Sequence, residues 1–254
     1  GSALSWATGD GCHLWGRNFD FNRLAEGTAV TYVPAGTAYA VCGSSLTGDV
    51  AAKSRRRARY AAVGMGLLQI PSSPILYEGV NDQGLMGGQL YYRYFAHYGT
   101  GGPRDGCPIQ PPFVVYHLLA QCATVVEAAE ELERHLTLVP RPLLGMVPHL
   151  HWAFSDRTGE MLIVEPDEDG LHLYRHTLGV MTNSPGYPWH RTNLLNYAGI
   201  RDLDREGLVF GDEHLAQCFS GSGAQGLPGD WSAPSRFVRL AFLRKYAVRG
   251  ADET

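Results

Sequence analysis

Short runs of aliphatic and aromatic residues, separated by Gly, Pro, Asn and Asp, recur along most of this chain. Runs of this kind are typical of β-strands joined by tight turns. They predict a strand–turn–strand unit over residues 77–92, with the turn at Asn-Asp-Gln-Gly. Further strands are expected at residues 3–8, 12–19, 28–34, 39–43, 60–66, 151–156, 161–165, 171–175 and 179–183.

Apolar residues recur at helical spacing over residues 113–138, the clearest helical region of the chain. Thr124, followed three residues later by Glu127, forms a capping box, so we expect two helices that divide near Thr124. Residues 189–200 and 234–248 are also expected to be helical. The order of strands, helices, antiparallel strands and helices predicts an α+β sandwich, with two layers of sheet and helices outside them.

The first predicted hairpin brings the start of the chain back onto polar side chains. Its turn is expected at Gly9-Asp10-Gly11, because these residues tolerate the positive φ of a tight turn. Antiparallel pairing then sets Ser2 opposite Asn18 and the amino group of Gly1 beside Arg17 and Asp20. An N-terminal nucleophile hydrolase needs this arrangement, with the terminal amine as general base and the side chain of residue 1 as nucleophile. Gly1 has no side chain with which to attack.

Composition narrows the classes of partner. The chain has 254 residues, 44% of them hydrophobic, which permits one large domain or two. A net charge of −4 favours neither nucleic acid nor an anionic membrane as partner. The one basic run, residues 53–59, is expected to be solvated, with residues 44–58 forming an exposed loop. No apolar stretch approaches the ~20 residues needed to cross a bilayer.

The five cysteines are widely spaced and form no CxxC pair. An odd number at such spacing argues against a disulfide framework and against zinc, and it favours a reducing, cytoplasmic location. The cysteines are Cys12, Cys42, Cys107, Cys122 and Cys218.

Polar residues that could carry chemistry gather at strand ends and glycine turns. Taken singly, each has an ordinary structural interpretation, such as an ion pair, a turn former or a half-buried tyrosine. His149 and His151 share a strand face, but no third ligand is near in sequence, so no metal site is expected. The chain contains no GxSxG, no P-loop and no GxGxxG. The polar candidates are Arg17, Asp20, Tyr91, Tyr92, Asn183 and Arg236.

Several stretches, in the same order along the chain, resemble the penicillin V acylase and bile salt hydrolase (choloylglycine hydrolase) family. They are Gly-Arg-Asn-Phe-Asp at 16–20, residues 72–87, Gln-Leu-Tyr-Tyr at 89–92, residues 179–190, Gly-Leu-Pro-Gly-Asp at 226–230 and Ser-Arg-Phe-Val-Arg at 235–239. Leu-Tyr-Tyr and Ser-Pro-Gly-Tyr look more like the acylases, because the bile salt enzymes more often have Asn where Tyr91 stands.

The resemblance implies a single domain over residues 1–254 with an αββα fold, two antiparallel sheets between helix layers, that cleaves amides between an acyl group and an amine. Residue 1 would be the nucleophile position, Arg17 and Asp20 would hold and tune the terminus, and Arg236 would complete the charge network. An oxyanion would be stabilised at Tyr91 and Asn183. The substrate would be a small-molecule acyl amide, with no cofactor and no metal, and the assembly a homo-oligomer, often a tetramer. The residues expected to bind substrate are Phe19, Ile70, Tyr91 and Tyr187.

The chain departs from the family pattern twice. The family begins Cys-Ser-x-Leu-Ser, and here Gly1 stands in place of Cys, either as a replacement or as a residue left by an expression tag. Ser2 would face the other side of the strand, so we expect the chain to be inactive or nearly so. It also stops at Thr254, inside what the family continues as further helix and strands, so a C-terminal part is expected to be missing or separate.

Three functions remain open on the sequence. A cysteine amidohydrolase close to penicillin V acylase is favoured, and hydrolysis of bile salts or N-acyl-homoserine lactones is the alternative within the same class. Trp15, Phe19 and Tyr187 suggest a pocket for flat or apolar acyl groups. A non-catalytic binding protein that has lost its nucleophile is the alternative of another class, motivated by Gly1. Binding of substrate without cleavage would distinguish it.

Overall fold

A seven-stranded antiparallel sheet forms the centre of the computed structural model, which describes residues 1–20, 26–44, 50–70, 72–100 and 102–252. The strand order across this sheet is β13-β12-β11-β8-β7-β6-β3. Its strands are β3 (Ala29–Val33), β6 (Ala62–Leu67), β7 (Ile75–Asn81), β8 (Met86–Tyr91), β11 (Leu150–Ser155), β12 (Met161–Asp167) and β13 (Gly170–Tyr174).

Two helices, α1 (Val114–Gln121) and α2 (Val125–Arg134), cover one face of this sheet, and a 3₁₀ turn at Pro111–Phe113 leads into α1. The larger of two cores lies between these helices and the sheet. It includes Trp152 and Phe154 from β11 and much of α1. Every residue from Val114 to Ala120 is buried. A helix that is buried all round packs against neighbours on several sides.

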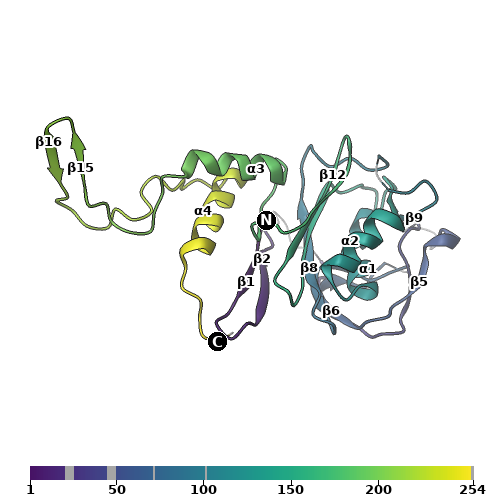
Figure 1. The fold of residues 1–254 in the computed structure, drawn as a ribbon. Helices are drawn as coiled ribbons and strands as arrows, with labels where there is room; N and C mark the ends of the chain where they lie inside the picture. The colour runs from purple at the N-terminus through teal and green to yellow at the C-terminus, as the bar shows by residue number, and fades with distance from the viewer. Residues whose placement is uncertain (21–25, 45–49, 71, 101, 253–254) are drawn as a thin grey trace.

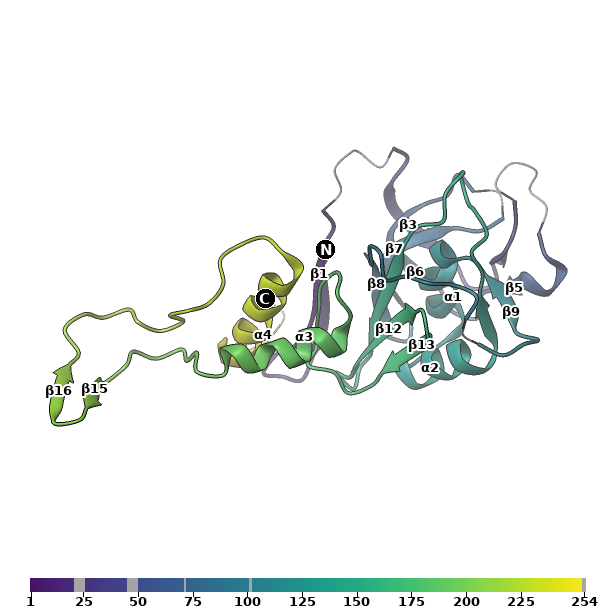
Figure 2. The same ribbon diagram turned by 90° about the horizontal axis from the view of Figure 1, so that it is seen from above.

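A three-stranded sheet in the order β14-β1-β2 lies on the other face of the large sheet. The second core joins the two sheets, because Leu90, Ala153 and Ile163 of the large sheet pack with Ala3 of β1 and Phe237 of α4. Figures 1 and 2 show α3 and α4 beyond the small sheet, so the layers run helix, sheet, sheet, helix. The predicted αββα fold is confirmed. The elements of this half are β1 (Ser2–Ala7), β2 (His13–Asn18), β14 (Val180–Met181), α3 (Tyr187–Asn193), a 3₁₀ turn at Leu194–Tyr197 and α4 (Ala233–Tyr246).

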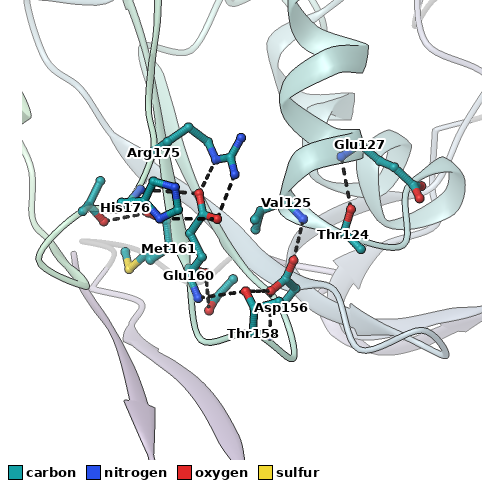
Figure 3. Close-up of polar contacts among 11 residues, drawn as sticks. Thr124, Val125, Glu127, Asp156, Thr158, Glu160, Met161, Arg175 and His176 are labelled. Carbon is teal, nitrogen blue, oxygen red and sulfur yellow. Dashed lines mark hydrogen bonds and ion pairs between the residues drawn. The ribbon is translucent and has the colours of Figure 1, made fainter.

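Thr124 is the N-cap of α2 and divides α1 from α2 as predicted, although the reciprocal bond of Glu127 goes to the residue before the cap. The Thr124 hydroxyl accepts from the Glu127 amide at 3.2 Å, while the Glu127 carboxylate accepts from the Ala123 amide at 2.9 Å. Asp156, in the turn between β11 and β12, accepts from the Val125 amide at 2.8 Å and so ties α2 to the sheet (Figure 3). The bonds to the Val125 and Glu127 amides satisfy donors in the first turn of α2 that have no partner within the helix.

Two glycines allow β6 and β7 to approach closely. Gly64 pairs with Gly79, and a Cβ on Gly64 would lie 1.9 Å from the carbonyl oxygen of Glu78. Only residues without a Cβ permit this backbone approach.

Two predictions about secondary structure are wrong. Residues 44–58 are not all an exposed loop: β5 (Arg55–Arg57) pairs with β4 (Ala38–Ala40), and Ser54, in a 3₁₀ turn at Ala52–Ser54, is buried. Residues 45–49 of that stretch lie outside the described residues. The predicted helix over 113–138 ends early, because β10 (Leu136–Leu138) pairs in parallel with β9 (Cys107–Ile109). Tertiary pairing overrides the local spacing there.

A hairpin that the sequence analysis did not predict projects far from the rest of the molecule (Figures 1 and 2). It consists of β15 (Gly207–Phe210) and β16 (Glu213–Ala216), and all eight residues are exposed. Among the described residues, no helix is both long enough and apolar enough to cross a membrane.

Candidate active site

The N-terminal hairpin delivers residue 1 to the centre of the site. β1 and β2 pair in the register Ser2↔Asn18, as predicted from the turn at Asp10. On its other edge β1 pairs with β14 in the register Ala3↔Met181. Continuing that register by two residues sets Gly1 opposite Asn183.

Hydrogen bonds converge on the carboxamide of Asn183. Its Oδ1 accepts from the amino nitrogen of Gly1 at 2.7 Å and from Nη2 of Arg236 at 2.8 Å. Its Nδ2 donates to the main-chain oxygen of Tyr91 at 2.7 Å. Arg236 also donates to the carbonyl oxygen of Gly1 and, at 2.6 Å, to Oγ of Ser2. The start of β1, the loop after β14 and the first turn of α4 therefore meet at Asn183.

Arg17 of β2 lies near the amine and is held by other partners. Its Nε lies 2.5 Å from a carboxylate oxygen of Glu78, and its Nη1 donates to the main-chain oxygen of Gln89 at 2.6 Å. The guanidinium carbon lies 4.3 Å from the centre of the Phe19 ring. Glu78 was missed by the sequence analysis, although an acidic residue inside the apolar run of β7 is a detectable signal.

The surroundings lower the pKa of the Gly1 amino group from 8.0 to about 6. Burial is the largest cause, followed by the positive charge of Arg236; Asp20 opposes both, and Arg17 adds a smaller lowering. An amine with a pKa of about 6 is largely unprotonated at neutral pH and can accept a proton.

The structure brings together most of the residues expected to act at residue 1. Gly1, Asn183, Arg236 and the main chain of Tyr91 are in contact as described. Arg17 and the exposed Asp20 lie close enough for their charges to shift the pKa of the amine, Arg17 downward and Asp20 upward.

The residues expected to bind substrate divide into two groups. Phe19 stacks on Tyr77 with ring centres 5.2 Å apart, and the Tyr91 side chain, 52% exposed, lies at the surface. Ile70, by contrast, is buried in the larger core. Tyr187 is buried in the second core, where its hydroxyl accepts from the Leu178 amide at 2.9 Å. The expected contact of Ile70 and Tyr187 with substrate stays a prediction, and in this structure both side chains are packed in a core.

A buried carboxylate lies behind the Asn183 loop. Both oxygens of Glu165 accept from the Tyr187 amide, at 3.0 and 2.9 Å, and one lies 3.3 Å from Nδ1 of the buried His151. A Cβ on Gly186 would lie 2.9 Å from this carboxylate and 2.8 Å from the Tyr92 hydroxyl. Glu165 of the large sheet therefore holds the segment that follows Asn183 in close contact with that sheet.

One group of side chains in the described part of the chain could hold a metal ion. The ligand atoms of Asp167, Asp169 and His172 all lie within 4.8 Å of one another. His172 is already 2.7 Å from Asp169, and the Tyr92 hydroxyl donates to Asp167 at 2.7 Å. We assign this group no part in the chemistry.

The four layers, with the amine of residue 1 set among a carboxamide and two guanidinium groups, define an N-terminal nucleophile hydrolase. The model of linear amide C–N hydrolases of the choloylglycine hydrolase family matches residues 1–254, so the chain belongs to that family.

Two relatives of the chain are named as hydrolases of bile salts or conjugated bile acids. The chain is 30% identical over 255 residues to a bile salt hydrolase/transferase from Clostridium perfringens. This alignment covers 100% of this chain and 74% of the relative. It is 28% identical over 245 residues to a conjugated bile acid hydrolase from Lactobacillus gasseri, covering 95% of this chain and 73% of the relative.

Solved structures agree on the fold. A variant of the conjugated bile acid hydrolase from Clostridium perfringens superposes with a TM-score of 0.85 at 29% identity, over 99% of this chain and 75% of that one. Penicillin V acylase from Agrobacterium tumefaciens superposes with a TM-score of 0.71 at 19% identity, over 100% and 67%. At that identity the second likeness shows the fold alone.

Proposed function

We propose that, with Cys at position 1, this chain hydrolyses the amide between a small acyl group and an amine. The observation that carries the proposal is the amine of residue 1, which is held by Asn183 and has a pKa lowered to about 6. A Cβ at Gly1 would lie 3.2 Å from the Asn18 carbonyl oxygen and 3.3 Å from the Leu90 side chain. The Asn18 main chain and the Leu90 side chain must each yield by a few tenths of an ångström to admit a side chain there.

The proposed reaction passes through an acyl-enzyme. The amine takes the thiol proton, the thiolate attacks the carbonyl carbon, and the amide carbonyl oxygen becomes an oxyanion. The ammonium then returns its proton to the leaving amine as the C–N bond breaks and a thioester forms. Water, deprotonated by the same amine, releases the carboxylic acid and restores the thiol.

Asn183 and Arg17 have separate roles in this proposal. One hydrogen of Asn183 Nδ2 is committed to Tyr91, and the other is available to the oxyanion. Nη2 of Arg17 is buried and has no hydrogen-bond partner among the residues that the structure describes. This donor is open to a thiolate at position 1 or to the substrate carbonyl. Asp20 and Arg236 set the charge around the amine.

For the substrate we propose an aromatic acyl amide of the penicillin V type. The stacked rings of Phe19 and Tyr77 next to Arg17, with the exposed Tyr91, support a flat acyl group. Conjugated bile salts are the second candidate, favoured by the names of the relatives at 28–30% identity. N-acyl-homoserine lactones remain within the same class.

The test is Gly1→Cys with phenoxyacetyl, bile salt and acyl-homoserine lactone amides as substrates. Release of the phenoxyacetyl acid with the highest kcat/KM supports the substrate assignment, and a higher value on bile salts reverses it. The original Gly1 chain should bind the preferred amide and not cleave it. If the folded Gly1→Cys chain binds all three amides and cleaves none, the chain is a binding protein and the proposed function is wrong.

We also propose a single-domain, cytoplasmic homo-oligomer, in which a tetramer is the expected size. The exposed hairpin supports assembly, because an isolated two-stranded hairpin is marginally stable in water and this one exposes Leu208, Val209 and Phe210. The five free cysteines support the location. Sedimentation of the chain with and without Phe210→Ser would test the assembly; a monomer in both cases would contradict it.

A further inference from the structure

A histidine that has no part in the proposed mechanism contacts the main chain of Asn183. His190, on α3, is buried, and its Nε2 lies 2.9 Å from the main-chain oxygen of Asn183. We propose that His190 is a positioning residue, which aims the Asn183 carboxamide and couples it to the helix that carries Arg236. The proposal rests on the function proposed above.

The hydrogen bond defines the state of the ring. A carbonyl oxygen can only accept, so Nε2 of His190 carries the hydrogen and donates it. Burial lowers the pKa of His190, which favours the neutral ring. In the neutral ring only one nitrogen carries hydrogen, so the donor to Asn183 is the single N–H that this side chain has.

The same ring also contacts α4. It stacks on Phe237, the residue after Arg236, with ring centres 4.7 Å apart and planes 12° from parallel. Thr182, whose Oγ1 lies 3.5 Å from Nε2 of His190, donates to the main-chain oxygen of Ala233 in the first turn of α4 at 3.0 Å. His190 thus lies where the Asn183 loop and the Arg236 helix meet.

Other contacts hold the loop further along, whereas His190 contacts the main-chain oxygen of Asn183 itself. Ser184 Oγ donates to the Arg93 carbonyl oxygen at 2.8 Å, and Glu165 holds the Tyr187 amide. Because Oδ1 of Asn183 serves both the Gly1 amine and Arg236, a small rotation of this residue weakens two contacts together. A displacement of about 1 Å at a catalytic group can cost roughly 100-fold in rate.

Two substitutions separate the donor from the ring. In the Gly1→Cys chain, His190→Phe keeps the stacking on Phe237 and removes the N–H, whereas His190→Gln keeps an amide N–H at about the same reach and removes the ring. We expect His190→Phe to lower kcat by about 10- to 100-fold with little change in KM and a small change in Tm. His190→Gln should recover much of kcat while its Tm falls further. His172→Phe, a histidine of β13 that stacks on Tyr174, is the control and should leave kcat unchanged.

The relative kcat values of His190→Phe and His190→Gln distinguish a positioning role from a structural one. If kcat follows Tm across both variants, so that His190→Gln is the less active, His190 has only a structural role and the proposal is wrong.

A second readout does not depend on turnover. In the original Gly1 chain, the side-chain amide signal of Asn183 reports its bond to the Tyr91 oxygen by NMR. His190→Phe should shift this signal and speed its hydrogen exchange, and His190→Gln should leave it closer to the parent. An unchanged signal in His190→Phe overturns the positioning role even if Gly1→Cys proves inactive. A shifted signal with an inactive Gly1→Cys chain would sustain the positioning role and reject the proposed hydrolysis.

Discussion

The carboxamide oxygen of Asn183 lies 2.7 Å from the amino nitrogen of Gly1, although 182 residues separate them in the chain. The pairing of β1 with β14 produces this contact, because the register Ala3↔Met181 runs on to Gly1 and Asn183. The base and the oxyanion donor of the proposed reaction therefore lie one residue before β1 and two residues after β14, next to paired strands that fix their separation.

The pH dependence of the Gly1→Cys chain follows from the lowered pKa of its amine. The free amine is the reactive form, so kcat/KM should be constant at neutral pH and fall about tenfold per unit below a pKa of about 6. A pH profile of kcat/KM measures this. An acidic limb centred near 8, the ordinary value for an α-amino group, would contradict the proposed field around residue 1.

Asn183→Ala in the Gly1→Cys chain should lower kcat by about 10²–10³-fold, because it removes an oxyanion donor. Steady-state kinetics on the preferred amide measures the loss. Asn196→Ala, an exposed asparagine in the 3₁₀ turn after α3, is the control and should leave kcat near the parent value. Equal losses in both variants would remove Asn183 from the mechanism.

Arg236→Met in the Gly1→Cys chain should move the acidic limb of the pH profile upward. The positive charge of Arg236 lowers the pKa of the amine, so its removal raises that pKa from about 6 towards 8 and the rate at pH 7 falls. Arg191→Met, an exposed residue of α3, should leave the limb in place. A limb that stays fixed in Arg236→Met, or moves down, would show that the charge of Arg236 does not lower this pKa.

Glu78→Ala should destabilise the fold by about 3–5 kcal/mol, because it leaves the buried guanidinium of Arg17 without its carboxylate. Urea unfolding measures the change in free energy. Glu133→Ala, exposed on α2, should stay within about 0.5 kcal/mol of the parent. A similarly small effect for Glu78→Ala would mean that the main-chain oxygen of Gln89 suffices for Arg17.

Gly64→Ala should destabilise the large sheet by about 1–3 kcal/mol or more, because its Cβ would lie 1.9 Å from the Glu78 carbonyl oxygen. Gly16→Ala is the matched control within β2, where a Cβ would meet no atom within 4 Å. Thermal unfolding compares the two variants. Equal melting temperatures would show that β6 and β7 can separate without cost.

Much of this protein could be predicted from local sequence. The N-cap at Thr124 and the Gly-Asp-Gly turn depend on residues a few positions apart, and both were correctly assigned. The register of the first hairpin followed from its turn, and it predicted that Arg17 and residue 1 lie close together. The family motifs around Tyr91 and Asn183 are likewise contiguous stretches.

Only the tertiary structure decided which side chains meet. Glu78 reaches Arg17 across 61 residues and His190 reaches Phe237 between two helices, and no periodicity records such partners. Tyr187 looks like a pocket residue in the sequence, yet packing between sheet and helix buries it. A chain's local pattern determines where it turns and which face is apolar. The free energy of packing distant segments together determines whether an aromatic or charged side chain faces a substrate, a core or another charge.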